Sequence, residues 1–289
     1  MLLNIFMVVY RESFEAVLIV TILWAILRRQ PDSERYREPV LSGILGGFAV
    51  SLVLALGLLY SQSELSAQVL EYFNFGLLFL AVLLITHMCI WMKRHGSQIK
   101  GELQQRFLEA KNQPNRWAIR LLAASAVARE GIETVIFLFG SFYESKGAQL
   151  AMNCLVACLG LVAAIATWFL LNKGIAFIRP KRLFAVTSFF LFLTASHFLV
   201  QISKGLIQSE ILPALQDPAY DVSSILPDTE GFGSVLSSFA GYQAAPALTT
   251  VILWWTYWII ALALYYRAGR DLASTAAMGP RVSKESYSS

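Results

Sequence analysis

Long apolar stretches alternate with short polar segments along the whole chain. The apolar stretches occupy residues 2–27, 40–60, 69–92, 117–142, 150–171, 183–204 and 248–266. A helix needs roughly 20 mostly apolar residues to cross a hydrocarbon core of about 30 Å, and each stretch is close to that length. The pattern therefore predicts an all-α, polytopic membrane protein with seven transmembrane helices.

Composition supports this prediction. Of the 289 residues, 56% are hydrophobic and only 15% are charged, and the mean hydropathy is +0.57. These values exclude a water-soluble domain of this size, so we expect a multi-pass protein surrounded by membrane lipid.

Basic residues predict the orientation of the helices. They gather in the first, third and fifth connections and after residue 266, whereas the second, fourth and sixth connections together hold only Lys146 and Lys204. Positively charged loops stay in the cytosol, so we expect the N-terminus outside and the C-terminus in the cytosol. The net charge of +4 is thus a topology signal, and it does not indicate nucleic-acid binding.

The spans predict one transmembrane permease domain over residues 1–266 and a polar cytosolic tail without regular structure at 267–289. Two halves, about 1–92 and 117–204, each contain three spans, so they run through the membrane in opposite directions. This arrangement predicts a 3+3 inverted repeat. An outer loop at 205–247 then leads to the seventh helix at 248–266.

The third connection contains "SQIKGELQQRFLEAK", in which Ile99, Leu103 and Phe107 recur every four residues among charges. This spacing predicts a short amphipathic helix. It would lie on the inner membrane surface or form a cytosolic helix.

Both halves open on the pattern R-E-x-x-E, as "RESFE" at 11–15 and "REGIE" at 129–133. Glu12 is about 15 Å along the first helix at 1.5 Å per residue, and Glu130 lies at a similar depth in the fourth. Six charged side chains left facing lipid at this depth would cost roughly 15 to 20 kcal/mol. They must therefore face one another, an ion or water.

The spacing of the motif indicates what it can bind. Glutamates at i and i+3 share one helix face, so Glu12 with Glu15 and Glu130 with Glu133 present paired carboxylates. We expect Arg11 and Arg129 to point away from the neighbouring glutamate, which leaves each free to pair with a carboxylate of another helix. Carboxylates outnumber guanidiniums, so a cation site is favoured over neutral ion pairs that only fix helix packing. Hard oxygen ligands suit iron (especially ferric), manganese, magnesium or calcium.

At these residues the chain resembles the oxidase-dependent iron permease family, which includes fungal high-affinity iron permeases, bacterial Efe-type iron permeases and lead permeases. "LEYFNFG", "IWMKR", "AYDVSSILPDTEGFGS" and "GYQAAP" also look like segments of that family. The resemblance implies seven spans and a location in the bacterial inner membrane. It also implies import of iron, as ferric ion after oxidation by an extracytoplasmic oxidase partner, through the glutamates of both motifs. Iron would be the substrate, and no permanently bound cofactor is expected.

Several further residues are candidates for accessory roles. Glu71 matches a glutamate of the family's third span and is a candidate ligand where cations enter. Asp221 falls in the matching part of the outer loop, whose acidity can concentrate cations or dock the oxidising partner. His87 and His197 lie within apolar spans and are candidates for ligand or proton-relay roles, although buried histidines more often serve packing. Asn74 stands where relatives often have an acidic residue.

Two other functions compete with iron import. The first is transport of another divalent cation, with lead or manganese the nearest rivals. The second is an intramembrane metalloenzyme, which would need a water-activating pattern such as H-E-x-x-H that the sequence lacks. We therefore do not expect an enzyme.

Overall fold

The computed structural model describes residues 2–96, 99–112, 116–142, 145, 147–173 and 180–277. Within these ranges all regular structure is helical, which confirms the all-α prediction. The helices are α1 (Leu2–Arg28), α2 (Ser33–Glu64), α3 (Ala67–His95), α4 (Ile99–Lys111), α5 (Trp117–Phe142), α6 (Ala148–Asn172), α7 (Pro180–Gln208), α8 (Gly231–Ala240) and α9 (Leu248–Ala277).

Five helices, α2, α3, α6, α7 and α9, are long and apolar enough to cross a membrane. Their outer faces carry many exposed large hydrophobic side chains, such as Leu45, Phe48 and Val53 on α2, as expected of surfaces in lipid. The two remaining long helices, α1 and α5, carry the R-E-x-x-E motifs, which place charged side chains in the middle of each helix.

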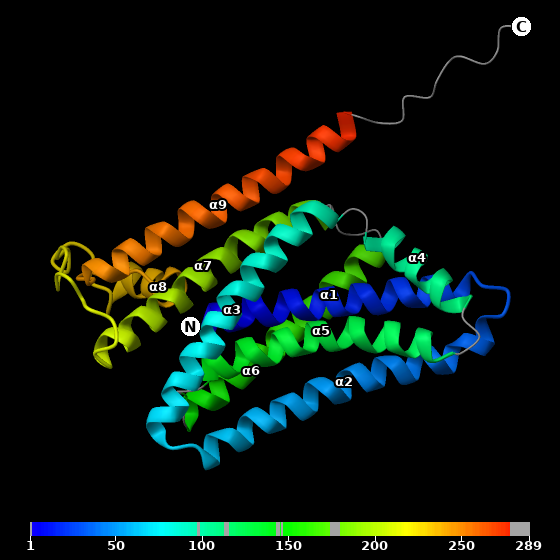
Figure 1. Ribbon diagram of the computed structural model, residues 1–289, viewed down its shortest axis with the longest axis horizontal. Helices are drawn as coiled ribbons and strands as arrows, with labels where there is room; N and C mark the ends of the chain where they lie inside the picture. Colours follow the sequence, from blue (N-terminus) through cyan, green and yellow to red (C-terminus); the bar gives the residue numbers. More distant parts are fainter. Residues whose placement is uncertain are drawn as a thin grey trace, which may run out of the picture.

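The motif helices lie at the centre of the molecule. Helix α2 packs along α5, α6 packs along α1, and α1 and α5 also contact each other. Helix α3 packs against α7, and α9 contacts both of them. Figure 1 shows the long helices running to and fro between two ends of the molecule, one marked by α4 and the other by α8.

Glycines allow the closest of these helix contacts. A Cβ atom on Gly47 of α2 would lie 2.6 Å from the carbonyl oxygen of Ala124 on α5. A Cβ on Gly160 of α6 would lie 2.9 Å from the carbonyl oxygen of Phe6 on α1. Each motif helix is thus approached by the backbone of a neighbour, as small residues allow in membrane bundles.

The amphipathic helix of the third connection forms as predicted, but its apolar face does not lie on the membrane surface. Leu103 and Phe107 of α4 are buried in a cluster with Leu23, Val40 and Ile119, from α1, α2 and α5. Other helices of the protein, and not lipid, therefore cover the apolar face of α4.

Two further elements differ from the sequence-based expectation. Within the outer loop, the segment "GFGSVLSSFA" forms α8, which packs on α7. Helix α9 continues to Ala277, so the beginning of the predicted unstructured tail is helical. The rest of that tail, residues 278–289, lies outside the described ranges.

Candidate cation site

Each motif arginine forms an ion pair within its own helix. Arg11 Nε donates to Glu15 Oε1 at 2.7 Å, and Arg129 Nε donates to Glu133 Oε1 at 3.2 Å. The expectation that the arginines pair with carboxylates of other helices is therefore wrong. Residues i and i+4 lie on the same helix face, so the second glutamate of each motif is the nearest available partner.

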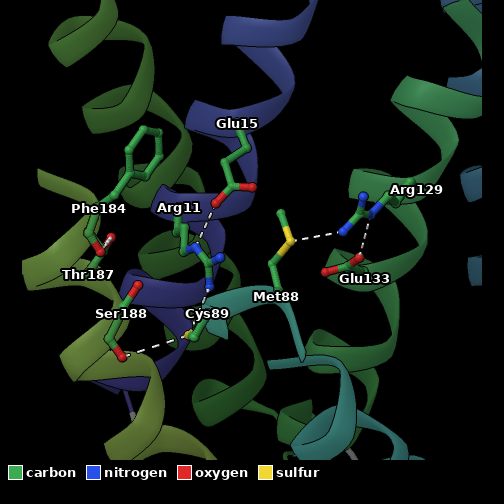
Figure 2. A network of polar contacts seen from close by, with 9 residues as sticks. All are labelled: Arg11, Glu15, Met88, Cys89, Arg129, Glu133, Phe184, Thr187 and Ser188. Carbon is green, nitrogen blue, oxygen red and sulfur yellow. Dashed lines mark hydrogen bonds and ion pairs between the residues drawn. The ribbon is translucent and has the colours of Figure 1, made fainter. Parts of the chain in front are cut away.

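Helix α3 supplies a second contact for both arginines, as Figure 2 shows. Arg11 Nη1 lies 3.7 Å from Cys89 Sγ, and Arg129 Nη2 lies 3.0 Å from Met88 Sδ. The guanidinium of Arg129 also lies 5.1 Å from the centre of the Trp91 ring, within the range of a cation–π interaction. Sequence reasoning did not assign these three residues to the site. Trp91 belongs to the segment "IWMKR" that resembles the family, but Met88 and Cys89 lie in an apolar span without a motif.

The four motif glutamates are all buried. Glu12 and Glu130 are 1% and 2% exposed, and Glu15 and Glu133 are each 5% exposed. Glu15, Glu130 and Glu133 lie near enough to Glu12 to repel it electrostatically. The Oε2 atoms of Glu12, Glu130 and Glu133 have no hydrogen-bond partner among the described residues.

The carboxylates are thus gathered in one region but do not form a closed coordination shell. Among the described side chains, no three of histidine, cysteine, aspartate and glutamate converge closely enough to hold a metal ion. The ion pairs with Arg11 and Arg129 occupy two of the four carboxylates.

A cavity of about 720 Å³ opens from the α4 end of the molecule towards the motifs. It is lined by Lys100 and Arg106 of α4 and reaches Glu15, Arg129 and Glu130. The side chain of Arg129 is accordingly 39% exposed, whereas that of Arg11 is 2% exposed. Water at the α4 end therefore has access to one motif arginine and not to the other.

A second cavity, of about 470 Å³, lies towards the α8 end. It is lined by two of the predicted accessory residues, Glu71 and His197, and by Asn74. None of the four motif glutamates lines it. On α5, the buried side chains of Ile136 and Phe137 lie between Glu133 and the cavity-lining Ser141.

The Iron permease FTR1 family matches residues 2–274, nearly the whole chain. The chain belongs to this family. It is 30% identical to the ferrous iron permease EfeU of Shigella sonnei over 94% of its own length and 99% of that protein. It is 28% identical to the ferrous iron permease EfeU of Yersinia pestis, over 96% and 97% of the two chains. No solved structure matches it.

Family membership confirms the resemblance that the sequence motifs indicated. The protein is an iron permease, a multi-pass membrane transporter and not an enzyme.

Two predicted accessory residues of this iron permease lie away from both cavities. Asp221 is exposed after α7, and its Oδ1 accepts hydrogen bonds from the backbone nitrogen and hydroxyl of Ser223 at 2.9 and 2.6 Å. These bonds lower the pKa of the Asp221 carboxyl. His87 is exposed on α3 and lines neither cavity.

Proposed function

We propose that this permease imports iron through a midplane site made by Glu12, Glu15, Glu130 and Glu133. The observation that carries the proposal is the set of buried, unpaired carboxylate oxygens on two helices inside an apolar bundle. Four carboxylates and two guanidiniums have a formal charge of −2, which a cation offsets. A buried anionic group without a partner is unfavourable, so these carboxylates favour binding of a positive ion.

The proposed topology has seven crossings, in which α1–α3 and α5–α7 form two inverted halves and α9 is the seventh. In such a repeat α1 corresponds to α5, α2 to α6 and α3 to α7. The packing of α2 on α5 and of α6 on α1 supports this topology, because the symmetry axis that exchanges the two halves converts one contact into the other. The contacts of α1 with α5 and of α3 with α7 are each preserved by the same exchange. By the distribution of basic residues, the α4 end faces the cytosol.

Transport follows when the two halves rock about the fixed site. The conformation of the permease in this structure is then inward-facing, since the cavity from the α4 end reaches Glu15, Arg129 and Glu130. Apolar side chains on the other side, among them Val8, Leu78 and Phe137, belong to one buried cluster. When iron binds, Arg11 and Arg129 exchange their carboxylates for other partners, and Cys89, Met88 and Trp91 hold the guanidiniums aside.

The oxidation state of the ion separates two forms of the proposal. Carboxylate oxygens are hard ligands and favour ferric iron, which an extracytoplasmic oxidase partner would supply. The relatives from Shigella sonnei and Yersinia pestis are named ferrous iron permeases, which favours Fe²⁺. Lead or manganese remain the rival substrates.

Uptake of radioactive iron into liposomes containing the purified protein tests the function. Iron is offered as Fe²⁺ kept reduced by ascorbate or as Fe³⁺ chelated by citrate, with Mn²⁺ and Pb²⁺ as competitors. We expect protein-dependent accumulation of one of the two iron species that a tenfold excess of Mn²⁺ does not abolish. Accumulation of Mn²⁺ or Pb²⁺ in preference to both iron species would assign the chain to another cation.

A further inference from the structure

The cavity near α8 brings together polar residues from three separate parts of the chain. Glu71 and Asn74 come from α3, His197 comes from α7, and Gln243 follows α8; all four line the same space of about 470 Å³. On α5, Ser141 lines it about 12 Å beyond Glu133, at 1.5 Å per residue. The cavity is therefore separate from the motif glutamates.

The hydrogen bond of His197 leaves a free lone pair on its ring. Nδ1 lies 3.1 Å from the carbonyl oxygen of Ser237 on α8. A carbonyl oxygen only accepts, so Nδ1 carries the proton and donates it, and the lone pair of the neutral ring is on Nε2. Histidines that bind metals generally use this arrangement, in which the second ring nitrogen donates to a backbone carbonyl or a carboxylate.

Two buried amides in the cavity have unpaired atoms. Asn74 is 6% exposed and Gln243 is 7% exposed. Asn74 Oδ1 and Gln243 Nε2 have no hydrogen-bond partner among the described residues. Buried polar atoms are nearly always satisfied, so atoms that protein leaves unpaired indicate bound water or a ligand. Asn74 Oδ1 accepts, so it can receive a hydrogen bond from a water molecule held by a cation, whereas Gln243 Nε2 donates and can bond to a cavity water molecule that the ion does not hold.

We infer that the cavity near α8 binds a partly hydrated Fe²⁺ ion through His197 Nε2 and the Glu71 carboxylate. Water on the ion donates to Asn74 Oδ1, and a further water molecule in the cavity accepts from Gln243 Nε2. Even a fully hydrated ion with about six waters, at about 30 Å³ per water, occupies roughly 180 Å³, so a partly hydrated ion fits within the 470 Å³ of the cavity. This inference rests on the proposed import of iron and names the oxidation state in which the ion arrives.

The ligand types around the cavity favour Fe²⁺ over Fe³⁺, and the balance of charges favours weak binding. Imidazole is a borderline ligand that suits Fe²⁺, whereas ferric iron prefers sites made of oxygen anions alone. The ammonium of Lys204, which is exposed, also lines the cavity and offsets the charge of Glu71. A site without excess negative charge binds weakly enough for the ion to move on towards the motif glutamates.

Anaerobic equilibrium dialysis of the purified full-length protein with radioactive Fe²⁺ tests the inference. His197→Gln and Glu71→Gln should each lose one ion per chain, or bind it at least about tenfold more weakly. Glu130→Gln should keep that ion, because the motifs are separate from the cavity. Gln208→Ala is the matched control, since Gln208 lines the same cavity but is exposed.

Two further measurements separate coordination from a structural role. Asn74→Asp places a carboxylate where the unpaired amide oxygen lies, and it should tighten binding of this ion. Mn²⁺ bound in place of Fe²⁺ should show hyperfine coupling to an imidazole nitrogen that His197→Gln abolishes. Unchanged Fe²⁺ binding in both His197→Gln and Glu71→Gln would overturn the inference. A wild-type protein that binds this ion but imports no iron would instead refute the proposed function alone.

Discussion

The two motif ion pairs differ in burial, so neutralising their glutamates should affect stability unequally. Glu15→Gln leaves the guanidinium of Arg11 without its carboxylate partner at 2% exposure. Glu133→Gln does the same to Arg129, whose side chain is 39% exposed and also contacts Met88 and Trp91. The same chemical change therefore removes a buried ion pair in one helix and a partly hydrated one in the other.

Breaking a buried pair costs about 3 to 5 kcal/mol, and the lower figure applies here because glutamine keeps an oxygen acceptor and Glu12 remains beside Arg11. In the pair of Arg129 and Glu133 one partner is partly exposed, so we take the upper value for exposed pairs, about 1 kcal/mol. At about 2 to 4 °C per kcal/mol, we expect Glu15→Gln to lower Tm by roughly 6 to 12 °C and Glu133→Gln by no more than about 4 °C.

The assay is thermal unfolding of each purified variant in the same detergent at neutral pH, with Glu34→Gln on the exposed first turn of α2 as the control. Equal losses of Tm in the two motif variants would refute the reasoning. A larger loss for Glu133→Gln would refute it as well.

Three other outcomes follow from the structure. Gly47→Ala should destabilise the protein by about 1 to 3 kcal/mol in thermal unfolding, because its Cβ would lie 2.6 Å from a carbonyl oxygen of α5, whereas Gly46→Ala meets open space and should be neutral. Arg129→Lys keeps the charge but loses the planar fork that contacts both Glu133 and Met88, so the initial rate of iron uptake should fall by about tenfold. Asp221→Asn should leave uptake within about twofold of wild type, because Asp221 is exposed and lines neither cavity. This ratio should not change between pH 5 and 8, because the hydrogen bonds from Ser223 lower the pKa of the Asp221 carboxyl and keep it ionised throughout that range.

The alternation of long apolar stretches and short polar segments predicts the long helices well. The apolar stretches at 69–92 and 117–142 correspond to α3 and α5, since a helix in lipid must satisfy its own backbone hydrogen bonds and leaves few alternatives. Helix α8 was not predicted, because a ten-residue apolar segment inside an acidic loop has no partner that the sequence reveals.

The candidate site was predictable only in part. The paired R-E-x-x-E motifs identify the buried glutamates, because charges in apolar spans are costly and therefore functional. The contacts of Arg11 with Cys89 and of Arg129 with Met88 could not be predicted, since sulfur atoms within an apolar span have no distinctive pattern. That Glu71 and His197 line one cavity likewise depends on how α3 packs against α7.

The most direct test of the central claim is the initial rate of iron uptake by liposomes that contain Glu130→Gln. Glu130 is 2% exposed, has an unpaired Oε2 and forms no ion pair with either motif arginine, so its loss removes a carboxylate without breaking a salt bridge. We predict that Glu130→Gln reconstitutes normally but accumulates no iron above protein-free liposomes, while Glu34→Gln transports as wild type. Undiminished iron uptake by Glu130→Gln would contradict a transport site built from the motif glutamates.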